Sequence, residues 1–532
     1  MAADYILKSK NVFTGTDDVP CEACVIVSGD KILDVVSADE AEQYQDGQTT
    51  VIDYGDKLIL PGFLDSHNHI GMCMDMVDES FCIDVTGCTC FEEVMGAMKK
   101  FGEQHPDNKV VYGVNLNLFD MNDGFIPTRE AMDRYFPDRP ALLWTWDMHT
   151  YYANTKAIEL AGITKDTPDP NNGIGKDANG ELDGSFNDEA AFMMQKVVHR
   201  PDEERKNALR IFMKKLNECG VTSVSCQYPC GAVKPYPLYK LMEDELTARI
   251  NFFTDLFEFT PENAEAYKKE YNSPMLQFSG LKVLLDGVLT VFTAWMLEPY
   301  TNNPTVKGFP SIPKEKMKEK IFEAVQHGYN VRVHTIGDQA VRYALDVFEE
   351  AEKKYGKIDR HHAMEHIENI NPADIPRFAQ LGVIASMQLR HAIFYVDDAI
   401  KYVGPERVKY CFNWRSILDT GAIIGTGSDY PVSYFNPMLG IHAGVTRTQD
   451  DGHPEGGWIP EQRITLAECI RAYTYGSACI FNRESELGTL EKGKLADITV
   501  LDRNLFEIPT HEILETKPVM TMTGGKIVFE RS

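Results

Sequence analysis

Two histidines near the N-terminus have a type and spacing that can bind a metal ion. His67 and His69 stand two residues apart in LPGFLDSHNHI, directly after a short apolar run. Residues i and i+2 of an extended strand project to the same side, so both imidazoles can reach one ion. Two polar histidines in a surface loop give the same pattern, and the pair alone leaves both interpretations open.

Four later apolar runs end in residues that bind or bridge divalent cations. They are Lys282 in GLKVLLDG, His334 in VRVHTIGD, His366 in AMEHIE and Asp429 in TGSDYP. Each has an ordinary alternative: a hydrogen-bonded core histidine for His334 or His366, a surface cation for Lys282, and a turn former for Asp429. Imidazole and carboxylate are ligands that zinc prefers in open catalytic sites, so their joint placement at strand ends predicts one metal site.

The middle of the chain, residues 61–485, must position these side chains. Apolar strands alternate there with amphipathic helical stretches, which is typical of a parallel sheet with helices outside. Eight such strands predict an α/β fold of the (β/α)8 TIM-like barrel type, whose active site lies at the C-terminal strand ends. The predicted strands are residues 62–65, 221–226, 249–256, 280–285, 330–334, 362–367, 383–387 and 422–426.

Two further regions flank or interrupt the predicted barrel. Residues 1–60 and 486–532 both contain short β-rich runs separated by turns, which predicts a small β-sandwich domain built from both termini. Residues 71–219 lie between the first and second barrel strands and are far too long for a loop. We therefore expect an inserted subdomain that covers the barrel mouth as a lid.

Composition limits the partners and the cellular location that we expect for this protein. The 532 residues are 43% hydrophobic and 25% charged, as expected of a globular protein. A formal net charge of −27 repels phosphate backbones and anionic bilayers, so we expect neither nucleic acid nor membrane as a partner. The chain has no apolar run of spanning length and no secretory signal, and its twelve cysteines are scattered, which favours a cytoplasmic location.

Several motifs occur in the order that one enzyme family shows. PGFLDSHNH opens the barrel, VHTIGD, EHIE and GSDYPV follow at later strand ends, and GTLEKGKLADITVLD closes the chain. With these motifs the sequence resembles the amidohydrolase superfamily, and in particular the YtcJ-like metal-dependent amidohydrolases of amidohydrolase family 3. The resemblance covers almost the whole chain. It implies a hydrolase that cleaves a C–N, amide-type bond of a small molecule, other than a peptide bond.

The resemblance also implies roles for side chains beyond the strand ends. The segment PTREAMDRYFPDRPALLWTWDMHTYYANTKAIELAGI is similar to the family's, which implies that His149 and Asn154 come near the active site and bind substrate. For Asn154, a helix cap is a nearly equal alternative. Arg390 and His391 in SMQLRH are also expected to bind substrate. Leu389 stands where proline is common in similar proteins, so this loop and the pocket can differ from the family's.

The predicted cofactor is a divalent metal, zinc in the first place, as one or two ions. Its predicted ligands are His67, His69, His334, His366 and Asp429, with Lys282 included if it is carboxylated, as in many superfamily members. Asp429 and His366 are the predicted catalytic residues, with Asp429 passing a proton from the attacking water to the leaving nitrogen. A non-catalytic binding protein and a metal-dependent lyase or isomerase stay open as alternatives. The expected assembly is a homodimer.

Overall fold

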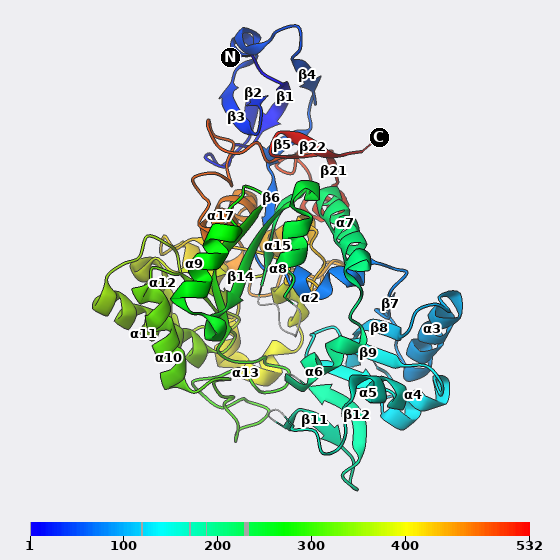
Figure 1. Cartoon of the computed structure of the whole chain (residues 1–532). Helices are drawn as coiled ribbons and strands as arrows, with labels where there is room; N and C mark the ends of the chain where they lie inside the picture. The colour runs from blue at the N-terminus through cyan, green and yellow to red at the C-terminus, as the bar shows by residue number, and fades with distance from the viewer. Residues whose placement is uncertain (1, 119–120, 170–171, 188, 228–233, 532) are drawn as a thin grey trace.

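The computed structural model describes residues 2–531 apart from 119–120, 170–171, 188 and 228–233. Three sheets organise the chain: one formed by both termini, a central parallel sheet, and one in the segment between the first two central strands. Figure 1 shows both chain ends in the upper part of the view, above the central sheet and its helices, with the inserted segment at the lower right.

The central sheet has eight strands, ordered as they occur along the chain, and each pairs in parallel with the next. All eight predicted strands are present. Ser66, after the first strand, donates from its backbone N–H and its hydroxyl to the carbonyl of Thr426, after the last, at 3.2 and 2.8 Å. The sheet therefore curls on itself and fits a TIM-like domain. Its strands are β6 (Phe63–Asp65), β13 (Val221–Cys226), β14 (Arg249–Asp255), β15 (Leu276–Leu284), β16 (Val331–Thr335), β17 (Ala363–His366), β18 (Ile384–Ser386) and β19 (Ile424–Gly425).

Helices between the central strands each bury one apolar face. In α11 (Asp338–Tyr355) the buried side chains recur every three or four residues, which is the spacing of one helical face: Ala340, Ala344, Phe348 and Ala351. Further helices of this kind are α7 (Asp202–Glu218), α10 (Lys314–Gln326) and α12 (Ile375–Leu381), whereas α15 (Pro437–Thr446), after the last central strand, is buried over most of its length. Within the described part of the chain, no helix combines the length and the apolar character needed to cross a bilayer.

The terminal sheet joins the two ends of the chain. β5 pairs antiparallel with β20, and β1 and β21 continue the sheet on either side. Arg249, at the start of β14, makes a buried two-pronged ion pair with Asp497 at 2.8 and 2.9 Å, which links this sheet to the central one. The strands are β1 (Tyr5–Val12), β2 (Cys21–Ser28), β3 (Lys31–Val36), β4 (Thr50–Asp53), β5 (Leu58–Pro61), β20 (Ile498–Leu501), β21 (Pro518–Thr523) and β22 (Lys526–Glu530).

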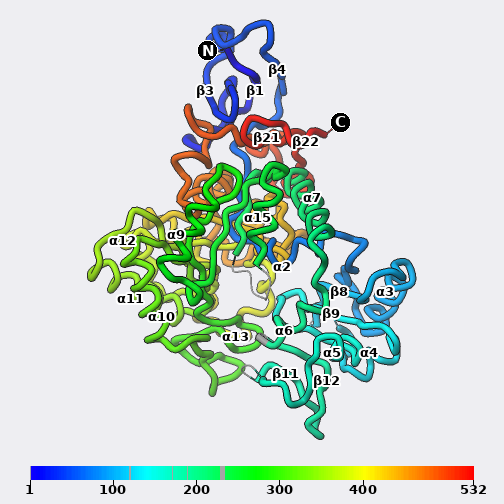
Figure 2. The backbone as a smooth tube through the Cα atoms, viewed as in Figure 1, coloured from blue at the N-terminus to red at the C-terminus, as the bar shows by residue number. Residues whose placement is uncertain are grey.

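The inserted segment has a six-stranded sheet and a hydrophobic cluster of its own. The tube in Figure 2 leaves the central sheet near α2 (Ile70–Cys73), passes through the segment, and returns along α7. Helix α3 (Phe91–Gln104) packs on the sheet through buried side chains that include Val94, Met98 and Phe101. The strands are β7 (Ile83–Asp84), β8 (Val111–Leu116), β9 (Ala141–Thr145), β10 (Thr150–Ala153), β11 (Ile174–Lys176) and β12 (Leu182–Asn187).

Candidate metal centre

The C-terminal ends of the central strands hold all the predicted ligands. They are His67 and His69 after β6, Lys282 in β15, His334 in β16, His366 at the end of β17 and Asp429 after β19. Because the strands are parallel, their C-terminal ends share one edge of the sheet, and side chains far apart in the sequence meet there.

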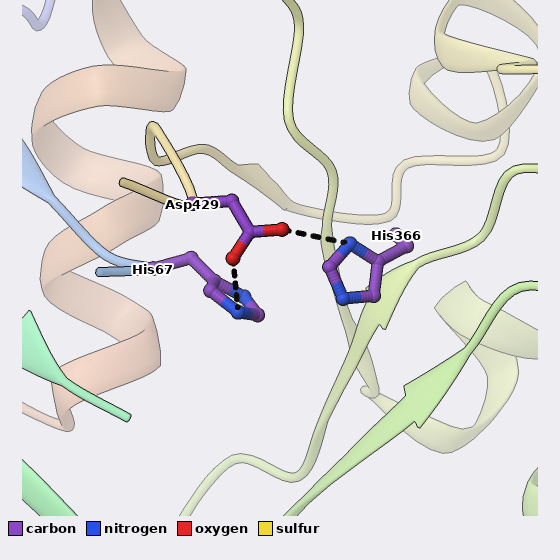
Figure 3. Close-up of side chains that lie close together, drawn as sticks. All are labelled: His67, His366 and Asp429. Carbon is purple, nitrogen blue, oxygen red and sulfur yellow. Dashed lines mark ion pairs between the residues drawn. The ribbon is translucent and has the colours of Figure 1, made fainter. Parts of the chain in front are cut away.

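Asp429 is the centre of the cluster. Its Oδ1 atom lies 3.3 Å from Nε2 of His67 and 3.0 Å from Nε2 of His69. Its Oδ2 atom lies 3.9 Å from Nδ1 of His366 and 3.8 Å from Nε2 of His391. Figure 3 shows His67 and His366 approaching different oxygens of the carboxylate. One ligand atom each from His67, His366 and Asp429 fit within 4.8 Å of one another, and all three residues are buried.

His334 and Lys282 complete the predicted set. The ring of His334 lies 4.5 Å from the ring of His366, and its Nε2 atom lies 3.8 Å from Oδ1 of Asp286. Lys282 is buried, and its charge is among the influences that lower the pKa values of His67, His334 and His366. The six predicted ligands therefore form one electrostatically coupled group.

Glu365 supports His67 from the side away from Asp429, and the sequence analysis missed it. Its Oε2 atom lies 2.6 Å from Nδ1 of His67, and its Oε1 atom accepts from Nε of Arg332 at 2.5 Å. The charges of Arg332 and Lys282 outweigh burial and hold the pKa of Glu365 well below its usual range. The ionised carboxylate can only accept, so Nδ1 of His67 carries the proton and Nε2 presents its lone pair to the cluster.

Asp65 accepts hydrogen bonds that connect the segments after the first and the last central strands. It accepts from Nδ2 of Asn68 at 2.9 Å and from the backbone N–H and hydroxyl of Ser428 at 2.9 and 2.6 Å. The Asp429 N–H also donates to the His67 carbonyl at 2.7 Å. Both Asp429 and His366 have positive φ, 58° and 68°, a region that costs energy and recurs at functional sites.

The titration state of the cluster suits a cation. Burial lowers the pKa of His67 to about 4 and that of His334 to about 3, and burial with the neighbouring His334 holds the pKa of His366 well below its usual value. Despite burial, His67 and His69 keep the pKa of Asp429 well below its usual range. At neutral pH His67, His334 and His366 therefore offer neutral imidazoles, and Asp429 offers an ionised carboxylate, the forms that bind metal.

Unsatisfied atoms in the cluster are also consistent with a metal. Among the described residues, Nδ1 of His366 and Nε2 of His391 are buried and have no hydrogen-bond partner. Buried polar atoms without a partner are rare because each costs free energy, and a divalent cation is a partner for imidazole nitrogens. The donor set and its geometry therefore fit a divalent metal of the zinc type.

Comparisons with known proteins agree with this geometry. A model described as "Amidohydrolase family" matches residues 50–529. The chain belongs to the amidohydrolase family. YtcJ of Bacillus subtilis (strain 168) is 29% identical over 92% of both chains, and N-substituted formamide deformylase of Arthrobacter pascens is 26% identical over 99% of both. An uncharacterized metal-dependent hydrolase of Pyrococcus furiosus superposes with a TM-score of 0.73 at 26% identity, covering 94% of this chain and 99% of its own. The predicted family resemblance is confirmed.

Within this amidohydrolase-family chain, Asn154 has the structural role that was its alternative. It is the N-cap of α5 (Thr155–Ala161), and its Oδ1 atom accepts from the N–H groups of Ala141 and Ala157, both at 2.9 Å. Its Nδ2 atom donates to the carbonyls of Phe136 and Arg139 at 2.8 and 2.9 Å. Its amide group is fully engaged inside the insert, which favours the cap role, and substrate binding by Asn154 stays a prediction.

The other predicted substrate residues have different surroundings. His391 lies at the cluster, with its ring stacked 6.0 Å from that of His366. Arg390 pairs with Asp450, with Nη2 at 2.7 Å from Oδ2. His149 is half-buried in the turn between β9 and β10, where its N–H donates to Asp147. The structure thus brings His391 directly to the predicted ligands and leaves the roles of Arg390 and His149 as predictions.

A cavity of about 1240 Å3 lies beside the cluster, between the insert and the loops of the central sheet. Trp146 from the insert, Phe394 from the loop after β18, and Tyr430 are part of its lining. His67, His366 and Asp429 do not line the cavity themselves. Tyr430, the residue after Asp429, does, so the cavity adjoins the cluster there. Its volume is ample for a small molecule.

Proposed function

We propose that this protein hydrolyses a C–N, amide-type bond of a small molecule, other than a peptide bond, with a metal-activated water. The observation that carries the proposal is the buried group of His67, His366 and Asp429, whose ligand atoms lie within 4.8 Å of one another. Membership of the amidohydrolase family and the formamide deformylase relative support a C–N bond as the target.

Zinc is the proposed metal, as one or two ions. Five residues would hold it, with a carboxylated Lys282 as a bridge in the two-ion case: His67, His69, His334, His366 and Asp429. A bound divalent ion supplies a Lewis acid for the scissile carbonyl and lowers the pKa of water towards about 7. Glu365 keeps Nε2 of His67 available for this purpose by accepting from Nδ1 at 2.6 Å.

Asp429 is the proposed proton carrier. Its low pKa keeps it ionised at neutral pH, so it can accept the proton that the attacking water loses. When the tetrahedral intermediate collapses, Asp429 returns this proton to the leaving nitrogen. His366 approaches Oδ2 of Asp429 at 3.9 Å and acts with it. His391, 3.8 Å from the same oxygen, and His149 would donate hydrogen bonds to the developing oxyanion.

The proposal extends to the architecture and the assembly. We propose a complete (β/α)8 barrel over residues 61–485, a β-sandwich of residues 1–60 and 486–532, and a lid of residues 71–219. Support comes from the joined edges of the central sheet, the β5–β20 pairing between the termini, and the cavity between insert and strand ends. A cytoplasmic homodimer that acts on a small molecule, without nucleic acid or membrane as a partner, is proposed as the working form.

Elemental analysis of the purified, tag-free protein, together with assays on N-formyl, N-acyl and cyclic amides, tests the function. We expect near-stoichiometric zinc, manganese or iron and hydrolysis that stops when the metal is removed. Labelled water must appear in the product, since a lyase or isomerase reaction would not incorporate it. A folded protein that takes up no divalent metal when it is supplied would overturn the proposal and favour a binding protein.

A further inference from the structure

Asp286 is a buried carboxylate beside the metal cluster, and the sequence analysis did not select it. It lies just after β15 and is 2% exposed. Its Oδ2 atom accepts from the backbone N–H groups of Trp295 and Gly337 at 2.9 and 2.8 Å, and its Oδ1 atom accepts from the N–H of Ile336 at 3.0 Å. One side chain thus joins the segment after β15 to the segment after β16.

The two segments pack so closely that two positions require glycine. A Cβ atom at Gly337 would lie 2.1 Å from the carbonyl oxygen of Trp295, and a Cβ atom at Gly287 would lie 2.1 Å from Oγ1 of Thr293. The Trp295 carbonyl also accepts from two N–H groups in the first turn of α11, at 3.1 and 3.2 Å. The segment that Asp286 holds therefore has little room to shift against the end of β16.

His334, the predicted ligand in β16, lies against this junction. Its Nε2 atom lies 3.4 Å from the carbonyl oxygen of Gly287 and 3.8 Å from Oδ1 of Asp286. Because both of these oxygens are acceptors, Nε2 is the nitrogen of the neutral ring that carries the proton. Nδ1 then keeps its lone pair and is the atom of His334 that can bind a metal ion.

The same segment also reaches the cavity beside the cluster. Between Gly287 and Trp295 the chain makes a tight turn, in which the N–H of Val288 donates to Oγ1 of Thr293 at 3.0 Å and the N–H of Thr293 donates to the Val288 carbonyl at 3.1 Å. Thr290, inside this turn, lines the cavity. The segment that Asp286 holds therefore contacts a predicted metal ligand and forms part of the cavity wall.

We propose that Asp286 is a positioning residue of the metal centre, which holds the Gly287 carbonyl against His334 and so presents Nδ1 of His334 to the metal. This inference rests on the proposed function, because it concerns the ligands of the same site. A purely structural role of Asp286 predicts a different result: its loss would lower the stability of the fold without a specific loss of metal affinity.

Asp286→Asn tests the proposal with a side chain of the same size. The amide nitrogen cannot accept from the N–H groups of Trp295 and Gly337, so the segment and its Gly287 carbonyl should move away from His334. We expect zinc affinity to fall by about 10- to 100-fold, measured by competition with a chelator of known affinity. A folded Asp286→Asn protein that binds zinc within about 3-fold of the wild type contradicts the proposal.

Asp338→Ala is the matched control. Asp338, in the first turn of α11, accepts from the N–H of Leu297 at 2.8 Å and so holds the same segment two residues beyond Trp295. In the described structure its hydrogen bonds do not involve His334. The variant should lower the free energy of unfolding of the zinc-free protein, measured by chemical denaturation, and leave zinc affinity within about 3-fold. Equal losses of zinc affinity in the two variants would assign Asp286 a structural role only.

A crystal structure of the zinc-loaded wild type tests the same geometry without a variant. We expect zinc on Nδ1 of His334, with Nε2 within hydrogen-bonding distance of the Gly287 carbonyl. Zinc on Nε2 overturns the proposal even if the Asp286 variant fails to fold. A protein that holds zinc in the expected geometry but shows no metal-dependent turnover on the amide panel would contradict the hydrolase function alone.

Discussion

The metal cluster and the insert use buried polar side chains in opposite ways. In the cluster, imidazoles and carboxylates from several strands converge, and Nδ1 of His366 and Nε2 of His391 are left without partners among the described residues. In the insert, Asn154 is equally buried, but all of its hydrogen-bonding groups serve the backbone around it. In these two places, the unsatisfied buried atoms belong to the predicted metal site, whereas the satisfied ones hold the backbone of the insert in place.

Removing a ligand from the cluster should have the largest effect. His67→Ala deletes the imidazole that lies 3.3 Å from Asp429 and 2.6 Å from Glu365, so we expect loss of the bound metal and a fall in kcat/KM of at least about 1000-fold. Metal content by mass spectrometry and turnover on the amide panel measure this. His362→Ala is the control: His362 precedes β17 at the opposite end from His366, and its Nδ1 accepts from the N–H of Val331. Equal metal loss in both variants would contradict the cluster.

Asp429→Asn should separate proton transfer from metal binding. The amide keeps the size of the carboxylate but cannot take up the proton of the attacking water, so kcat should fall by about 100- to 10000-fold. More metal should remain than in His67→Ala, because the imidazoles are unchanged. Turnover and metal content are measured on the same preparation. A variant that keeps more than a tenth of wild-type kcat would assign proton transfer to another group.

Glu365→Gln tests the support behind His67. Glutamine can present a donor to Nδ1 and so remove the fixed tautomer, which should weaken zinc binding by about 10- to 100-fold. Competition with a chelator of known affinity measures the change. Glu368→Gln makes the same substitution three residues later and should leave zinc affinity within about 3-fold. If the two variants lose zinc equally, Glu365 acts through general stability and not through His67.

The pH dependence of metal binding tests whether the buried imidazoles of the cluster differ from ordinary, exposed histidines. His67 and His334 have pKa values lowered to about 4 and 3 by burial, and that of His366 is also well below its usual value, so these imidazoles stay neutral at pH 5. Protons then compete with zinc only below about pH 4. Between pH 7 and 5 we expect zinc affinity to fall less than about 100-fold, whereas three ordinary histidines would lose on the order of 10000-fold. Competition with a chelator between pH 7 and 5 measures this change in zinc affinity.

The sequence predicted the residues of the metal cluster better than the residues that hold them in place, because the two sets depend on different information. Parallel strands that end at one edge bring His334 and His366 together whatever the details of packing, so the strand pattern sufficed. The bond from His67 to Glu365 joins residues 298 positions apart, and no local pattern records it. A charged residue inside the buried strand AMEH was the available signal. For Asn154, the cap position was visible locally, but the resemblance favoured substrate binding.

Asn154→Ala should have the smallest effect on activity and a clear effect on stability. The substitution removes the cap of α5 and leaves the carbonyls of Phe136 and Arg139 without their donor, at a cost of about 1–3 kcal/mol in the free energy of unfolding. Because no group of Asn154 is left for substrate, kcat/KM below the melting range should stay within about 3-fold of wild type. Chemical denaturation and turnover at low temperature measure the two quantities. A large loss of kcat/KM in a folded variant would restore Asn154 to the active site and remove the distinction between satisfied and unsatisfied buried groups.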